Sequence, residues 1–180
     1  MSTLQETGSA VGTWRLDPVH SSVGFEVPYL GGSFRGSFRS VKATLAVDET
    51  AARLEGSADV ASVDVKDENL TAHLQSPDFF DAERHPELSF AADGFALDVE
   101  RVSVPGELTI KGVTKPVELS GTVAAPIVDP YGNERLGLKL STTVDRTAFG
   151  VSWNAPLPSG EQALANDVAL TAELYFVREA

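Results

Sequence analysis

Apolar and polar residues alternate at period two along most of this chain. The longest regular run spans residues 136–144, where leucine, threonine and valine alternate with glycine, lysine, serine and threonine. Similar runs recur in about eight segments, separated by turn sequences at roughly ten-residue spacing. Because successive side chains of a strand point to opposite faces, the pattern predicts an antiparallel sheet with one buried and one solvated face.

Several of the inward positions carry residues that are too small to fill a core. They are Gly36, Ala43, Gly56, Ala58, Gly121 and Ala172. An eight-stranded barrel is about the size at which the interior either just fills with side chains or holds one small ligand. The small residues favour a barrel with a cavity over a sandwich. The alternative is that small and large inward residues interdigitate and fill the barrel.

One stretch, residues 69–90, interrupts the alternation, and we predict a short helical insert over residues 67–82. Leu70, His73 and Leu74 are spaced at i, i+3 and i+4, which places them on one face of a helix with Asp67 as N-cap. This insert is expected to cover the mouth of the barrel as a lid.

The second half of the insert contains Ser76 and Pro77, which resemble a second helix start with a capping serine and proline at the first helical position. The two adjacent aromatic residues that follow, Phe79 and Phe80, need apolar surroundings on both sides. We therefore expect one of them to face a ligand. After the insert, Asp93-Gly94 predicts a hairpin turn.

Composition limits the classes of function. The chain has 180 residues, which is the size of one domain, with 14 basic and 26 acidic residues and a net charge of -12. This charge repels phosphate backbones, so no nucleic-acid partner is expected. No apolar run approaches the length of a membrane span, so no stable membrane insertion is expected.

We divide the chain into a flexible N-terminal segment, residues 1–12, and one barrel domain, residues 13–180. The first dozen residues are small and polar, and order is expected to begin near Trp14. The N-terminus as given has neither a basic region nor an apolar core of the kind found in secretory signals. The sequence therefore predicts a cytoplasmic protein.

The three histidines, His20, His73 and His85, have no metal-ligand spacing, and no metal site is predicted. No nucleophile elbow, P-loop or dinucleotide fingerprint is present, so no catalytic residue is predicted. His73 either bonds a neighbouring protein group or contacts a ligand headgroup at the mouth. Asp17 is expected to brace the turn at Pro18, and Arg146 to pair with a carboxylate.

Six blocks, in order along nearly the whole chain, resemble the signatures of the YceI family. They are residues 17–21, 32–38, 73–74 with 78–81, 85–90, 106–116 and 146–150. The resemblance implies an all-β fold, a single lipocalin-like antiparallel barrel. It also implies that the interior holds a polyisoprenoid or a similar amphiphile.

We expect the chain to bind, store or transport such a lipid, a polyisoprenoid or an isoprenoid quinone, and to need no other cofactor. The expected partners are this hydrophobic ligand and, as an open alternative, a second copy of the chain in a homodimer. The predicted ligand-binding residues are Phe25, Phe34, Phe38, Leu54, His73, Phe79, Phe80, Phe90, Leu108, Leu119, Leu138 and Phe149.

Two other functions remain open at this point. One is an enzyme that acts on an apolar substrate in the same cavity, with His73, His20 or Arg146 as its polar residues. The other is a packed barrel that acts only through its surface. An ionisable pair inside the cavity would favour the enzyme, and a filled interior would favour the packed barrel.

Overall fold

The computed structural model describes residues 10–97 and 100–179, and most of these residues lie in strands. The strands are β1 (Gly12–Leu16), β2 (Ser22–Tyr29), β3 (Gly32–Phe38), β4 (Val41–Val47), β5 (Ala52–Asp59), β6 (Val63–Asp64), β7 (Glu87–Phe95), β8 (Val102–Ile110), β9 (Val113–Val128), β10 (Glu134–Asp145) and β11 (Asp167–Arg178). The helices are α2 (Glu68–Gln75) and the short 3₁₀ helices η1 (Val60–Ser62) and η2 (Arg146–Phe149).

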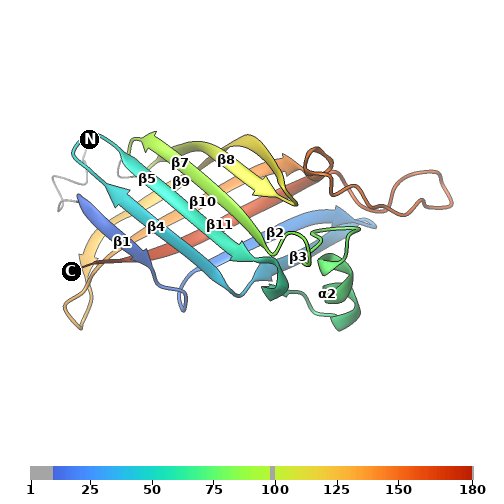
Figure 1. The fold of residues 1–180 in the computed structure, drawn as a ribbon, viewed down its shortest axis with the longest axis horizontal. Coiled ribbons are helices and arrows are strands. Elements are labelled where there is room, and N and C mark those ends of the chain that lie inside the picture. The colour runs from blue at the N-terminus through green and yellow to red at the C-terminus, as the bar shows by residue number, and fades with distance from the viewer. Residues whose placement is uncertain (1–9, 98–99, 180) are drawn as a thin grey trace.

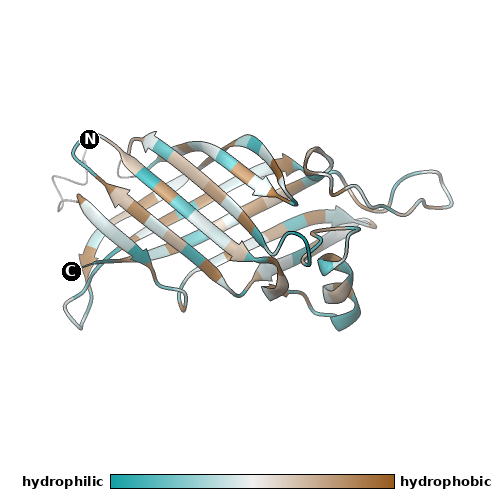
Figure 2. Ribbon diagram, viewed as in Figure 1, coloured by the Kyte–Doolittle hydropathy of each residue, from teal (hydrophilic) through white to brown (hydrophobic). Residues whose placement is uncertain are grey.

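Within the described residues, eight strands close into an antiparallel barrel. They pair in the order β1, β4, β5, β7, β8, β9, β10 and β11, and β1 pairs again with β11. The tilted strands are visible in Figure 1, and Figure 2 shows hydrophobic and hydrophilic residues alternating along them. The predicted all-β barrel is confirmed.

The two ends of the barrel differ because β11 has two partners along one edge. Its last residues pair with β1, through Leu16 and Phe176, and its middle pairs with β2, through Val23 and Ala172. The β2–β3 hairpin and β6 therefore continue the wall where β1 stops. Helix α2 lies at this end, at the right of Figure 1, and β1 lies at the opposite end.

The end that contains β1 is filled by a closed-end core. Its central side chains are Trp14, Leu45, Leu138 and Phe176, all fully buried. The Trp14 indole N–H donates to the backbone carbonyl of Ala10 at 2.8 Å, so the one polar atom of this ring is satisfied. Tight packing at this end blocks the barrel.

The predicted insert is present, but only its first half is helical. The Asp67 carboxylate accepts a hydrogen bond from the Leu70 N–H and caps α2, as expected. The predicted second helix at Ser76 is wrong, because α2 ends at Gln75 and turns follow. Ser76 is extended, with φ -76° and ψ 167°, which is the conformation that a following proline favours. We call residues 67–82 the lid segment.

The predicted hairpin turn at Asp93-Gly94 is also wrong. Strand β7 runs through both residues to Phe95. On β5, Arg53 pairs with Asp93 and Ala52 pairs with Phe95, so Gly94 is an extra, unpaired residue with φ +77°. A glycine at positive φ suits such a β-bulge as well as it suits a turn, and the sequence pattern alone does not separate the two.

The predicted N-terminal segment, residues 1–12, lies mostly outside the described residues. Of its described part, Ala10 is buried and Gly12 begins β1. In the parts of the chain that the structure describes, no helix is long and apolar enough to cross a membrane.

A polar network ties the closed end together. Arg135 donates to Asp17 at 2.8 Å and to Asp129 at 2.7 Å, which joins the turn before β2 to the β9–β10 loop. Burial acts to raise the pKa of Asp17, but hydrogen bonds from Arg135, His20 and the Val19 N–H outweigh it and lower this pKa to about 2. The hydrogen bond from Arg135 is the main cause that lowers the pKa of Asp129 to about 2.

Replacing Asp17 with asparagine should lower the free energy of unfolding at neutral pH. A carboxyl group whose pKa falls from 3.8 to about 2 on folding stabilises the fold above about pH 4, and this contribution is lost as the pH falls towards 2. The stabilities of the wild type and D17N should therefore differ at neutral pH and converge near pH 2. Urea unfolding across this pH range measures both, and a difference that stays constant down to pH 2 would contradict the network.

Candidate functional site

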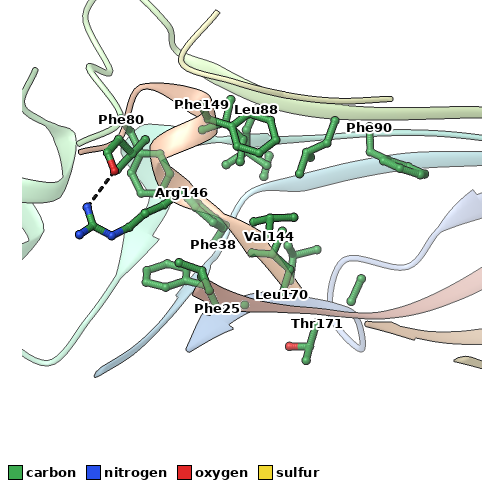
Figure 3. Close-up of a pocket in the computed structure, with 18 of the residues that line it drawn as sticks. Phe25, Phe38, Phe80, Leu88, Phe90, Val144, Arg146, Phe149, Leu170 and Thr171 are labelled. Carbon is green, nitrogen blue, oxygen red and sulfur yellow. Dashed lines mark hydrogen bonds between the residues drawn. The ribbon is translucent and has the colours of Figure 1, made fainter. Parts of the chain in front are cut away.

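A cavity of about 400 Å³ lies inside the barrel, between the closed-end core and the lid segment. This volume falls in the range of pockets that hold small ligands, ~300–1,000 Å³. Figure 3 shows side chains from β2, β3, β7, β10 and β11 around it, including Phe25, Phe38, Phe90, Val144 and Leu170. Almost all of the exposed lining is apolar.

Four of the six small inward residues line this cavity, as the prediction of an open interior required. They are Ala43, Gly56, Ala58 and Ala172. Each leaves room that a larger side chain at the same position would occupy.

The other two small residues, Gly36 and Gly121, do not line the cavity. The prediction that they leave space for a ligand is wrong. The space in front of Gly36 is filled by the Phe25 ring, which a Cβ would meet at 2.5 Å. A Cβ on Gly121 would fall on the backbone carbonyl of Lys139 in the neighbouring strand. These glycines permit close packing and do not create the cavity.

Eleven of the twelve predicted ligand-binding residues line the cavity. They are Phe25, Phe34, Phe38, Leu54, His73, Phe79, Phe80, Phe90, Leu108, Leu119 and Phe149. Leu138 is the exception, because it is fully buried in the closed-end core. The period-two pattern places Leu138 on the inner face correctly, but it does not say at which level along the barrel this face is filled.

Both aromatic residues of the lid segment line the cavity. The Phe80 ring packs against the wall, with its centroid 6.3 Å from that of Phe25 and 5.7 Å from that of Phe38. The Phe79 ring packs at the mouth, 4.9 Å from the His73 ring and 5.4 Å from the Trp153 ring. Both residues thus contribute to the apolar cover of the open end.

Trp153 lines the cavity but was not among the predicted ligand-binding residues. This residue lies in the loop between η2 and β11, which extends beyond the barrel at the right of Figure 1. It has no strand periodicity around it, so the pattern carried no signal for a cavity residue. The Trp153 ring nevertheless lines the mouth, with its centroid 4.8 Å from that of His73.

His73 is the polar residue of the lid segment that faces the cavity. Its Nε2 atom lies 3.0 Å from Asp78 Oδ2, and its side chain is 31% exposed. The ring therefore has a protein partner and also stands at the mouth. Both interpretations of His73 made from the sequence are compatible with this position.

Arg146 is buried beside the mouth, and the carboxylate partner expected for it is absent. Its guanidinium donates to the backbone carbonyls of Ala165, Val151 and Trp153, each at 2.8 Å. In the described parts of the chain, no carboxylate lies within ion-pair distance of it. Burial lowers the pKa of this guanidinium, with the neighbouring Asp145 charge acting in the opposite direction.

Lys111 also donates to backbone carbonyls at the mouth. It occupies the β8–β9 turn, and its Nζ atom donates to the carbonyl of Pro77 at 2.6 Å and to that of Gly150 at 3.2 Å. Lys111 therefore ties the lid segment to η2. Together with Arg146, it holds the irregular segments around the mouth through their backbone carbonyls.

The remaining histidines lie away from the cavity lining. His20 pairs with Asp17 at the closed end, 2.7 Å from its carboxylate, and His85 lies against Gly112 in the β8–β9 turn. Among the described residues, no group of three or more histidine and acidic side chains has a geometry that could hold a metal ion.

Comparison with known proteins gives consistent matches over nearly the whole chain. Residues 14–176 match the model of the YceI-like domain. A UPF0312 protein of Pectobacterium atrosepticum is 30% identical over 159 residues, which cover 84% of this chain and 83% of the relative. Protein YceI of Escherichia coli O157:H7 is 29% identical over 83% of this chain and 82% of its own.

Solved structures show the same fold. BcnA of Burkholderia cenocepacia has a TM-score of 0.75 at 23% identity, covering 89% of this chain and 98% of its own. A domain of Saccharophagus degradans, described as a polyisoprenoid binding domain implicated in plant cell wall breakdown, has a TM-score of 0.68 at 12% identity. That match covers 92% of this chain and 98% of the domain.

Replacing Arg146 with methionine should destabilise the protein by about 3–5 kcal/mol, because several buried carbonyls lose a charged donor and each unsatisfied group costs ~1–3 kcal/mol. The control is Arg35→Met, which removes an exposed arginine that pairs with Glu26 on the outer surface. The control should leave the free energy of unfolding almost unchanged, because exposed ion pairs add little stability. Urea unfolding of both variants makes the comparison, and equal losses would show that Arg146 does not support the mouth.

Proposed function

The chain belongs to the YceI family, and from this membership and the apolar cavity we propose that it binds a long-chain polyisoprenoid or a similar amphiphilic lipid inside the barrel. The observation that carries the proposal is the enclosed apolar space itself. Its described lining contains no acidic side chain; His73 and Arg146 lie at the mouth, and the exposed Lys42 of β4 also borders the cavity. An apolar chain with a polar head suits this arrangement, since the chain enters the barrel and the head stays near the mouth.

The apolar lining supplies enough free energy for useful affinity. Burying about a dozen methylene-sized groups yields ~10 kcal/mol at ~0.8 kcal/mol each. The cost of association is ~4–15 kcal/mol, so burial of the tail alone is comparable with that cost. Contacts of the head with His73 or with the exposed rim add to this affinity.

The description of one structural neighbour supports the class of ligand. The Saccharophagus degradans domain, which shares the fold over 92% of this chain, is described as a polyisoprenoid binding domain. We extend that class of ligand to this chain because the apolar cavity described above can hold the apolar end of such a molecule. Storage or transport of the lipid follows from reversible binding and is part of the same proposal.

The two alternatives receive less support. A packed barrel that acts only through its surface requires a filled interior, and here the interior holds a cavity of about 400 Å³. An enzyme requires a positioned acid or base beside its substrate. His73 pairs with Asp78 at the mouth, and Arg146 is engaged by backbone carbonyls, so neither is arranged for proton transfer in the depth of the cavity. The homodimer and the cytoplasmic location stay predictions.

Replacing Gly56 with leucine should fill part of the cavity and lower the affinity for long-chain prenols or quinones by tenfold or more. Gly56 lines the cavity, and a Cβ there lies 3.3 Å from the Lys42 carbonyl, so the side chain fits after a small shift. The control is Ser141→Leu, which places the same side chain at an exposed position on β10. Fluorescence titration with a prenyl probe measures both, and unchanged affinity in G56L would exclude this cavity as the site.

Replacing Phe79 with alanine should accelerate ligand release by tenfold or more with only a small loss of stability. Phe79 packs at the mouth against His73 and Trp153, where the lid segment can readjust, and related affinity changes appear mainly in the dissociation rate. Stopped-flow displacement of a bound prenyl probe measures the rate.

The control for this experiment is Phe95→Ala. Phe95 is buried in the closed-end core and does not line the cavity. Its replacement should cost ~3–5 kcal/mol of stability and leave release unchanged. If F79A instead loses stability as F95A does and releases the probe at the normal rate, the lid segment has no gating role.

A further inference from the structure

On three separate strands the cavity lining ends at a leucine. Its deepest lining residues on β5, β10 and β11 are Leu54, Leu140 and Leu174, which we call the floor. The next inward residues towards the closed end do not line the cavity and are almost completely buried; they are Ala52, Leu138 and Phe176. On each of these strands, which are far apart in the sequence, the open space ends and a packed core begins.

The space beyond the floor is filled by the closed-end core. Trp14 and Leu45 are fully buried there, and the floor residues belong to the same packed cluster. Protein interiors are packed as densely as organic crystals, so a ligand cannot extend past the floor without moving these side chains. The cavity is consequently closed at its lower end.

The depth of the cavity follows from strand geometry. On β11 the lining runs from Val168 near the mouth to Leu174 at the floor. At ~3.3 Å per residue this is roughly 20 Å along the strand, and a tilt of ~35–45° reduces it to about 15 Å along the barrel axis.

The depth of the cavity sets the length of chain that it can enclose. A chain with carbon–carbon bonds of ~1.5 Å and angles near ~111° advances roughly 1.25 Å per carbon, so about 15 Å holds about twelve carbons in line. An isoprene unit contributes about four carbons to the length of a chain, so this depth corresponds to about three units.

We propose that the floor acts as a ruler, so that the barrel encloses an apolar tail of about twelve carbons in line, or about three isoprene units. Any longer tail extends out through the mouth and gains little further affinity. This inference rests on the proposed lipid binding and adds a specificity for chain length, set by Leu54, Leu140 and Leu174.

The test is the affinity of the wild type for straight-chain primary alcohols of about eight to about eighteen carbons, measured by displacement of a fluorescent prenyl probe. Affinity should rise by more than about threefold for each added pair of carbons up to about twelve, and by less than about twofold for each pair beyond that length. A steady rise to the longest alcohol would overturn the ruler. If neither the probe nor any alcohol binds, the proposed function itself fails.

A matched pair of variants locates the ruler. Leu140→Ala removes a floor side chain and should move the break in affinity to alcohols longer by about two or three carbons. Leu136→Ala removes the same group from the same strand, but Leu136 lies in the closed-end core and does not line the cavity, so the break should stay in place. A break that moves equally in both variants, or in neither, would overturn the assignment of the floor. Leu174→Ala is the second floor variant, should Leu140→Ala not fold.

Discussion

The pairing of β11 with both β1 and β2 is the constraint on which this structure depends. Pairing with β1 closes the barrel and leaves these strands no free edge at that end. Pairing with β2 continues the wall at the other end, where the β2–β3 hairpin replaces β1. Because the closing strand is divided in this way, Trp14 fills one end while the other end keeps a space for a ligand.

The two ends of the barrel also differ in the groups that their cationic side chains bind. At the closed end, Arg135 joins two carboxylates across the surface. At the mouth, Arg146 and Lys111 instead bind backbone carbonyls of segments that have no strand partner. Because these cations are satisfied by carbonyls, the irregular loops are held in place without bringing an acidic side chain into the cavity, and the lining stays suitable for an apolar chain.

Much of the site followed from the alternation of residues, and the errors share a cause. The inward face was predicted correctly, so residues such as Phe25 and Phe90 do line the cavity. Leu138 was placed in the site although it lies in the closed-end core, and Gly121 was assigned to the cavity although a neighbouring carbonyl occupies its space. In both cases the sequence indicated which face of the sheet the residue lies on. What the residue contacts there depends on neighbouring strands, which the local pattern does not specify.

The sequence by itself determined the fold class, the inner face of most strands, the capped helix of the lid segment and the family. These properties depend on strand period, helix capping and motifs, all of which act between residues close together in the chain. Only the tertiary structure decided where the cavity ends and which groups Arg146 and Lys111 bind. The floor brings together residues of strands as distant as β5 and β11, whose relative positions depend on the registers of the strand pairs around the barrel, and such long-range alignment leaves no local pattern in the sequence.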